Sequence, residues 1–264
     1  MPSSPVLSDI LKHQKNGFIS YDIHNKLSKK YSISHYEIEK TALENDIIPL
    51  RYKRNSNTLN SKQQLILLTS KVAIVGCGGL GGHISELLAR VGVGNLLLMD
   101  FDKFDEHNLN RQNYSTLDSI GKYKVEVAKE FIYKINPSVN VVTCKEKFSG
   151  EFKKFLNYDL VVDALDDPKL KLLLAKETLK NKKHFVHGAI GGFNAQFTTD
   201  STLENLYRDN SKGSEIYLGN LSFMASFAAS VQASEIIKLL LDTGESLKNR
   251  ILFTDLLDNE FFIV

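Results

Sequence analysis

The order of apolar and polar positions from residue 71 onward predicts alternating strands and helices. Short aliphatic runs are repeatedly followed by longer amphipathic runs, which is typical of βαβ units with a mainly parallel sheet. The predicted strands cover 71–75, 95–99, 139–143, 159–163, 184–187, 194–198, 250–254 and 260–264, and the predicted helices cover 79–91, 122–135, 168–180 and 219–242. The last helix is apolar on most sides, so we expect it to be deeply buried. The pattern predicts an α/β, Rossmann-like fold with antiparallel strands at its C-terminal end.

The first 50 residues have a different pattern, that of short helices joined by turns. Apolar residues recur at helical spacing at Ile23, Leu27 and Tyr31, and Ser34 with Glu37 matches the capping box that begins a further helix. A nucleic-acid-binding helix-turn-helix fits this pattern, but lysines and glutamates are mixed and form no basic stripe. We therefore favour a packing or docking appendage. The sequence predicts two parts, a helical appendage over 1–50 and a main domain over 51–264.

The composition narrows the class of protein further. The chain has 264 residues, of which 42% are hydrophobic and 24% are charged. These values are ordinary for a globular protein and exclude a disordered or fibrous chain. Lys and Arg number 33 against 31 for Asp and Glu, which gives a formal net charge of +2. Because the charge is nearly balanced, a nucleic acid is an unfavoured partner.

The number of cysteines and the length of the apolar runs indicate whether the protein binds zinc or crosses a membrane. The two cysteines, Cys77 and Cys144, are too few for a disulfide framework or for a zinc site of four thiolates. No uninterrupted apolar run approaches the roughly 18 residues of a membrane span, and the N-terminus lacks the apolar core of a signal peptide. We therefore expect a cytoplasmic protein that binds neither zinc nor a membrane.

A glycine-rich turn follows the first predicted strand of the main domain. Gly76, Gly78 and Gly81 satisfy G-x-G-x-x-G between a strand and a helix, and Asp100 ends the next predicted strand. Glycines let the backbone approach a nucleotide closely, and the N-terminus of the following helix attracts an anion. A carboxylate at position 100 can accept hydrogen bonds from ribose hydroxyls. The pattern favours a mononucleotide or dinucleotide site over a merely structural turn.

The loop after Asp100 favours a triphosphate over a nicotinamide cofactor. It carries a second carboxylate, two asparagines, an arginine and a glutamine, namely Asp102, Asn108, Asn110, Arg111 and Gln112. Arginine offers a planar fork to phosphate oxygens, and Lys124 opens the next predicted helix. The sequence contains no G-x-x-x-x-G-K-[ST], so side chains such as these must hold a triphosphate if one binds.

Three carboxylates, Asp163, Asp166 and Asp167, cluster at the end of a later predicted strand. Carboxylates that face phosphates suit Mg²⁺, which takes one or two of them together with phosphate oxygens. Alternatively, Asp166 and Asp167 cap the helix that begins near Pro168. The sequence leaves both interpretations open.

These motifs together resemble the ubiquitin-activating-enzyme superfamily, specifically its bacterial ThiF/MoeB/HesA branch. The resemblance rests on RYKRN at 51–55, GCGGLGG at 76–82, LLLMDFD at 96–102, HNLNRQ at 107–112, GKYKVEVAKE at 121–130, INP at 135–137, DLVVDALDD at 159–167 and GNLSFMASFAASVQASEIIKLL at 219–240. It implies an ATP- and Mg²⁺-dependent adenylyltransferase. Such an enzyme adenylates the C-terminal glycine carboxylate of a small ubiquitin-like carrier protein ending in Gly-Gly, on the route to thiamine or molybdopterin.

The resemblance also implies roles for individual residues. It assigns Gly78, Gly79 and Gly81 to the nucleotide turn, Asp100 and the neighbouring Asp102 to the nucleotide, Asn108, Arg111 and Lys124 to the phosphates, Asp166 to Mg²⁺, and Arg54 to the triphosphate of the other subunit of a homodimer. Arg, Lys and Mg²⁺ would offset the charge that accumulates when a carboxylate attacks the α-phosphorus. No general base is needed, because a carboxylate is already ionised at neutral pH.

The chain departs from the family in its cysteines. Many relatives bind zinc through two C-x-x-C pairs, and some keep a cysteine in the crossing loop, which here is 200–219 and contains none. Cys77 is interpreted as a small filler in the glycine turn. We therefore expect no thioester or persulfide on this chain, with sulfur delivered by a separate donor protein. Position 167, an asparagine in the family, is Asp167 here.

Two alternatives remain. A superfamily member can instead activate another substrate, such as tRNA threonylcarbamoyladenosine in a dehydratase or a peptide C-terminus. In a different class, the glycine turn could belong to an NAD-binding oxidoreductase or to a catalytically silent binding protein.

Overall fold

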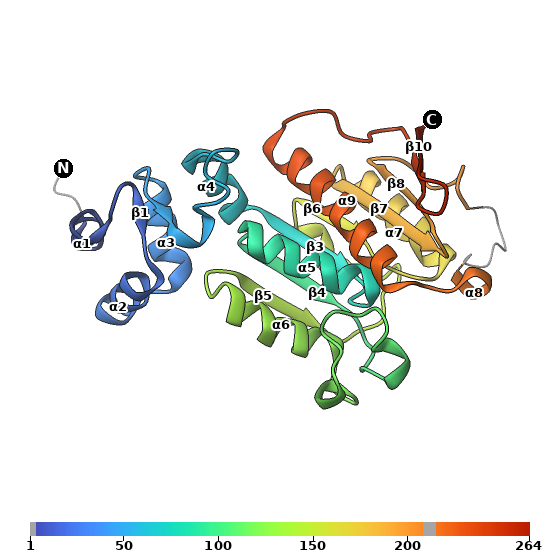
Figure 1. The fold of residues 1–264 in the computed structure, drawn as a ribbon, viewed down its shortest axis with the longest axis horizontal. Coiled ribbons are helices and arrows are strands. Elements are labelled where there is room, and N and C mark those ends of the chain that lie inside the picture. Colours follow the sequence, from blue (N-terminus) through green and yellow to red (C-terminus); the bar gives the residue numbers. More distant parts are fainter. Residues whose placement is uncertain (1–3, 208–214) are drawn as a thin grey trace.

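The computed structural model describes residues 4–207 and 215–264, so part of the predicted crossing loop 200–219 lies outside the described residues. Helices α1 (Pro5–His13), α2 (Tyr21–Tyr31) and α3 (His35–Leu43) form a helical unit at one end of the molecule, and the C-terminal strands lie at the other end (Figure 1). The helical unit has its own apolar core, which includes Ile10, Leu27 and Ile38. The backbone N–H of Glu37 donates to Ser34 Oγ at 3.1 Å, as expected for the start of α3.

A two-stranded parallel pair closes this unit. It is formed by β1 (Phe18–Ile19) and β2 (Ile48–Pro49), which the sequence pattern did not predict because two residues carry no periodicity. The short helix η1 (Leu50–Tyr52) and helix α4 (Ser61–Thr69) then lead to the main sheet.

The main sheet has eight strands in the order β10-β9-β8-β7-β6-β3-β4-β5. Its parallel strands are β3 (Lys71–Val75), β4 (Asn95–Met99), β5 (Asn140–Cys144), β6 (Leu160–Asp163) and β7 (His184–Gly191). Its antiparallel strands are β8 (Asn194–Thr199), β9 (Leu252–Asp255) and β10 (Glu260–Ile263). The predicted fold class is therefore confirmed, and most strand bounds agree within two residues. Strand β7 is longer than predicted because it forms a hairpin with β8 through Gly192, whose φ is +58°.

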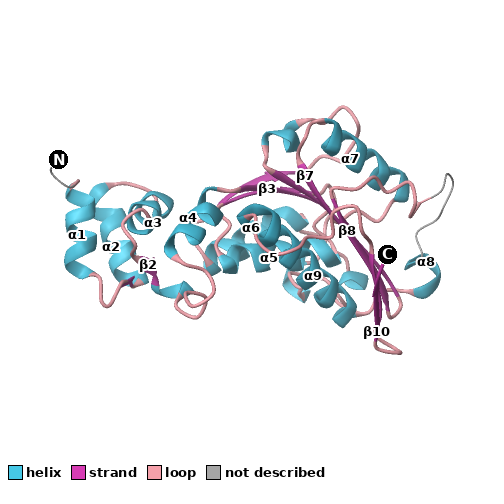
Figure 2. Ribbon diagram, turned by 90° about the horizontal axis from the view of Figure 1, so that it is seen from above, coloured by secondary structure: helices cyan, strands magenta, loops and turns pink. Residues whose placement is uncertain are grey.

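Helices cover both faces of the sheet (Figure 2). Helices α5 (Gly79–Val91), α6 (Lys124–Ile135) and α9 (Ser222–Leu241) lie on one face, and α7 (Pro168–Lys180) lies on the other. The remaining helical segments are short, namely α8 (Glu215–Leu218), η2 (Glu106–Asn108), η3 (Leu117–Ser119) and η4 (Lys154–Asn157).

Helix α9 is only partly buried, contrary to the prediction of deep burial. Met224, Ala228 and Ile236 are buried on the face that packs against α5 and β7, whereas Phe223 is 47% exposed. By length and composition alone, α9 is apolar enough to cross a membrane, although uninterrupted apolar runs are short. In the described structure its buried face forms part of the protein core.

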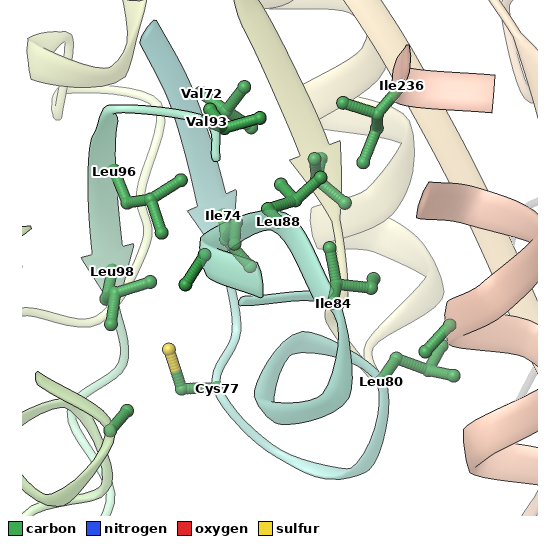
Figure 3. Close-up of a cluster of buried hydrophobic side chains, with 14 of the residues drawn as sticks. Val72, Ile74, Cys77, Leu80, Ile84, Leu88, Val93, Leu96, Leu98 and Ile236 are labelled. Atoms are coloured by element: carbon green, nitrogen blue, oxygen red, sulfur yellow. The ribbon is translucent and has the colours of Figure 1, made fainter. Parts of the chain in front are cut away.

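The larger apolar core lies between the sheet and the helices α5, α6 and α9. Ile74 and Leu98 from adjacent strands meet Ile84 and Leu88 of α5, and the side chain of Cys77 projects into this cluster beneath the glycine turn (Figure 3). Burial raises the pKa of the Cys77 thiol well above its usual range. Cys77 is thus an inert core residue, which agrees with its predicted packing role.

Candidate active site

A cavity of about 400 Å³ opens at the carboxyl ends of β3, β4 and β6. The chain leaves β3 toward β4 and β5 on one side and returns to β6 on the other, so this is the point where the strand order reverses. Ligands of open α/β sheets bind in the crevice at such a point, and the volume suits a small-molecule ligand.

The glycine turn forms one wall of this cavity. Gly76 has a φ of +98°, and a Cβ placed on it would lie 2.3 Å from the carbonyl oxygen of Ala164. A Cβ on Gly81 would lie 1.8 Å from the carbonyl oxygen of Gly76. Gly78 and Gly79 line the cavity, and the backbone N–H groups at the start of α5 lie beside it. The glycines therefore bring an electropositive helix end close to any bound anion.

Asp100 holds the glycine turn against the end of β4. Its Oδ2 accepts from the backbone N–H of Cys77 at 2.7 Å, and its Oδ1 accepts from the N–H of Asp102 at 2.8 Å. Burial raises the pKa of Asp100, although the two N–H donors oppose this effect. Because each carboxylate oxygen can accept a second hydrogen bond, Asp100 retains capacity to bind ribose hydroxyls.

Cationic and amide side chains line the cavity beside the turn, and the Arg111 side chain would lie 3.7 Å from a Cβ placed on Gly79. Lys124 is buried, and its Nζ lies 3.1 Å from Asp102 Oδ2. The Arg111 guanidinium donates to the carbonyl oxygen of His107 at 3.1 Å and to Asn110 Oδ1 at 2.8 Å. These contacts hold two positive charges in the lining of one cavity, which suits a polyphosphate.

Two amides complete this wall. Asn108 is buried, and its Oδ1 accepts from the N–H of Asp105 at 3.0 Å, which stabilises the loop. Gln112 is also buried, and its Oε1 has no hydrogen-bond partner among the described residues. Both amides belong to the lining of the cavity.

The three clustered carboxylates have different environments. Asp166 is exposed in the cavity lining and makes no hydrogen bond or ion pair with other described residues. Asp167 also lines the cavity, but its Oδ1 caps α7 by accepting from the N–H groups of Lys169 and Leu170. The capping interpretation thus holds for Asp167, while Asp166 remains open to a ligand.

Asp163 corrects the expectation that all three carboxylates face the phosphates. It is fully buried, with Oδ2 lying 3.3 Å from Lys171 Nζ and 2.6 Å from His187 Nδ1. Burial alone would raise the pKa of Asp163, but the Lys171 charge and the His187 hydrogen bond lower it on balance. Asp163 is therefore a paired core carboxylate and is absent from the described cavity lining.

The structure also reveals site residues that the sequence analysis did not single out. A second cavity of about 420 Å³ shares Asp166, Lys171, Ala189 and Ile190 with the first. Most of its other lining residues come from strands β8 to β10, and it also includes Pro168 of α7, Gly191 of β7, Leu218 of α8 and Tyr207. No sequence motif marked this cavity, because its walls come from distant segments paired in the sheet.

The structure does not bring Arg54 to the cavity of its own chain. Two residues earlier, the Tyr52 hydroxyl accepts from Asn136 Nδ2 at 2.8 Å and packs at Gly92, which ends α5. Helix α5 has 13 residues and is thus about 20 Å long, with the cavity at its other end. Arg54 is exposed at this remote end of the sheet.

The fold and the site define an α/β protein with a ligand cavity at the switch point of its sheet. The chain belongs to the ThiF family, whose model matches residues 52–264. It is 34% identical over 223 residues to the SAMP-activating enzyme E1 of Haloferax volcanii, covering 80% of this chain and 83% of that protein. It is 33% identical over 218 residues to the molybdopterin-synthase adenylyltransferase of Haemophilus influenzae, covering 78% and 90% respectively. The predicted resemblance is confirmed, and the protein is a nucleotidyltransferase.

Two further proteins resemble the chain over a shorter stretch or at lower sequence identity. The tRNA threonylcarbamoyladenosine dehydratase of Bacillus subtilis is 38% identical over 133 residues, which span 49% of this chain and 52% of that protein. E. coli MccB with ATP superposes with a TM-score of 0.69 at 22% identity, covering 91% of this chain and 81% of the MccB chain. The second likeness concerns the fold.

Proposed function

We propose that the protein uses ATP and Mg²⁺ to adenylate the C-terminal glycine carboxylate of a small ubiquitin-like sulfur-carrier protein ending in Gly-Gly. The observation that carries this proposal is that two neighbouring cavities share lining residues, among them Asp166 and Lys171. One holds the features of a polyphosphate site, and the other leads from Asp166 and Lys171 across the antiparallel strands. The relatives named as a SAMP-activating enzyme and a molybdopterin-synthase adenylyltransferase support this choice of substrate class.

The first cavity would bind ATP. Asp100 would accept from the ribose hydroxyls, with Asp102 beside it, and the N–H groups around Gly78 and Gly79 would donate to phosphate oxygens. Arg111, whose side chain lies beside Gly79, and Lys124 would hold the phosphates, with Asn108 fixing the loop that carries Arg111. Asp166, an exposed carboxylate without a partner among the described residues, fits an Mg²⁺ ligand. When bound, Mg²⁺ would supply charge that offsets the phosphate oxygens.

The second cavity would bind the extended C-terminal tail of the carrier. A tail that enters along β8 to β10 passes Phe253 and Phe262 and reaches Lys171, which lines both cavities. A tail carboxylate oxygen then attacks the α-phosphorus, the bond between the α-phosphorus and the bridging oxygen breaks, and pyrophosphate leaves. Arg111 and Lys124 stabilise the charge that develops on the phosphates. No proton moves, because the attacking carboxylate is already ionised.

Arg54 would complete this site from a second copy of the chain. Tyr52 places it about one α5 length from its own cavity, so its guanidinium can serve the triphosphate only across a subunit boundary. We therefore propose a homodimer. Sulfur would come from a separate donor protein, because both cysteines of this chain are buried.

The test is ATP–pyrophosphate exchange with small ubiquitin-like proteins ending in Gly-Gly from the same genome. We expect exchange that requires the carrier and Mg²⁺, and that is lost when the carrier's terminal glycine is deleted. Asp166→Asn should raise the Mg²⁺ concentration that exchange requires, because a proposed ligand of the ion is lost. Asp118→Asn, at another exposed position, is the matched control and should leave this concentration unchanged. Carrier-independent ATP consumption with tRNA carrying threonylcarbamoyladenosine, or exchange with a peptide alone, would replace the proposed substrate with the alternative one. Tight NADH binding without ATP binding would refute the proposal.

A further inference from the structure

The junction between the helical unit and the main domain contains a buried ion pair. Glu39 of α3 is fully buried, and its Oε2 lies 2.5 Å from Arg51 Nη1. The same nitrogen of Arg51 donates to Ser138 Oγ at 3.3 Å, in the loop between α6 and β5. Arg51 therefore joins a carboxylate of the helical unit to a hydroxyl of the main domain.

The next residue is fixed as firmly. Tyr52 is 1% exposed, its ring lies 5.7 Å from the Arg51 guanidinium carbon, and its hydroxyl accepts from Asn136. Burial and the neighbouring Glu39 carboxylate raise the pKa of Tyr52, so its hydroxyl stays protonated. Gly92 leaves room for this ring, since a Cβ there would lie 2.7 Å from the hydroxyl.

Arg54 follows two residues after Tyr52, in a compact turn. The N–H of Asn55 donates to the carbonyl oxygen of Tyr52 at 2.8 Å, and the N–H groups of Thr58 and Leu59 donate to the carbonyl oxygen of Asn55. The Arg54 side chain is exposed, and no hydrogen bond or ion pair with other described residues orients it. The place of Arg54 on the surface is therefore set by the anchored residues that precede it.

Apolar packing alone would not require a carboxylate at position 39. A buried ion pair is weak evidence for stability, because desolvation of the two charges offsets much of their attraction. A requirement for a fixed geometry at Arg51 accounts for the pair better than stability does.

We propose that Glu39 is a positioning residue which, through Arg51 and Tyr52, holds Arg54 in place to reach the nucleotide site of a second copy of the chain. This proposal rests on the proposed role of Arg54 in that site. It gives the helical unit a function in catalysis through the position of Arg54.

The test is a double-variant cycle measured by titration calorimetry with Mg–ATP on the full chain. Arg54→Ala should weaken Mg–ATP binding about tenfold, the scale of one hydrogen bond to a charged group. Glu39→Gln should weaken it to a similar degree, and the double variant should bind no more weakly than Arg54→Ala alone. Asp9→Asn is the matched control, because Asp9 pairs with Lys30 and Tyr31 inside the helical unit and should leave affinity unchanged.

Each outcome separates the two proposals. The positioning role would be overturned if Arg54→Ala weakens Mg–ATP binding while Glu39→Gln binds Mg–ATP normally, or if the two effects add in the double variant. The role of Arg54 would then remain intact. Normal binding by Arg54→Ala would overturn the role of Arg54 and the inference with it. Weaker binding by Asp9→Asn would show that any loosening of the helical unit has this effect, and would also overturn the inference. If Glu39→Gln does not fold, Arg51→Lys replaces it, with the same expected lack of additivity with Arg54→Ala.

Discussion

Replacement of Gly81 by alanine should destabilise the whole protein. The added Cβ would lie 1.8 Å from the carbonyl oxygen of Gly76 and 3.2 Å from the Ala164 side chain. Neither neighbour can move easily, because the N–H of Gly76 donates to Met99 in β4 at 2.8 Å and the N–H of Ala164 donates to Val75 in β3 at 2.9 Å. The methyl group therefore meets a backbone that is fixed on both sides.

The magnitude follows from the size of the overlap. Ordinary contact begins near 3.4 Å, so helix α5 and the turn must separate by about 1.6 Å at this point. Overpacking of this kind costs about 3 kcal/mol, at the upper end of measured values. For a chain of this size, each kcal/mol lowers Tm by about 2–4 °C, so Gly81→Ala should lower Tm by about 6–12 °C.

Gly79→Ala is the matched control, since it adds the same methyl group two residues earlier in α5. Its nearest neighbours are the Ala225 and Arg111 side chains at 3.7 Å, which is ordinary contact. We expect its Tm to equal or exceed that of the wild type, because alanine favours the helix. Its Mg–ATP affinity should fall, because position 79 lines the cavity. Thermal unfolding by circular dichroism and calorimetric titration measure both effects. An unchanged Tm for Gly81→Ala, or an equal decrease in Tm for Gly81→Ala and Gly79→Ala, would refute this reasoning.

Three further predictions concern the chemistry and the helix cap. Arg111→Ala and Lys124→Met should each lower ATP–pyrophosphate exchange about 100-fold or more with little change in Tm, and near-normal exchange would mean that the loop does not contact the phosphates. The double variant Cys77→Ala, Cys144→Ala should keep adenylate formation, measured as carrier-dependent exchange; its loss in a folded, ATP-binding protein would restore a thiol step. Asp167→Ala should lower Tm by about 2–4 °C through the lost cap of about 1 kcal/mol while exchange persists, and lost exchange at unchanged Tm would make Asp167 a ligand instead.

The fold was predictable because its signals are local. Alternation and amphipathic spacing located the strands and helices from residue 71, and the glycine turn fixed where β3 passes into α5. The pair β1–β2 was not predicted, because strands of two residues show no periodicity. The exposed face of α9 was not predicted either, because composition does not tell which segments pack against a helix. Those features depend on contacts between distant segments.

The candidate site was predictable by residue type and less so by environment. By residue type and spacing alone, the sequence VVDALDD does not distinguish Asp163 from Asp166 as a metal ligand. The structure separates them, because the register of β6 with β7 places Asp163 beside His187, and α7 brings Lys171 over the same carboxylate. Asp166, three residues on, has left the strand and lies in the cavity lining. The pairing of strands and the packing of a helix thus give a physical reason for the choice of Asp166 that the family resemblance implied.

The length of α5 has a genetic consequence. If the arginine at one end of this helix serves a neighbour's nucleotide while the aspartate near the other end serves its own, mutant alleles fall into two complementation groups. Arg54→Ala and Asp166→Ala subunits, each impaired in adenylation on its own, should give more adenylation activity when expressed together in one cell, because one site of each mixed dimer has every group. Two alleles from the same group should never do so. The distance between the two ends of α5 would thus determine which pairs of alleles complement each other.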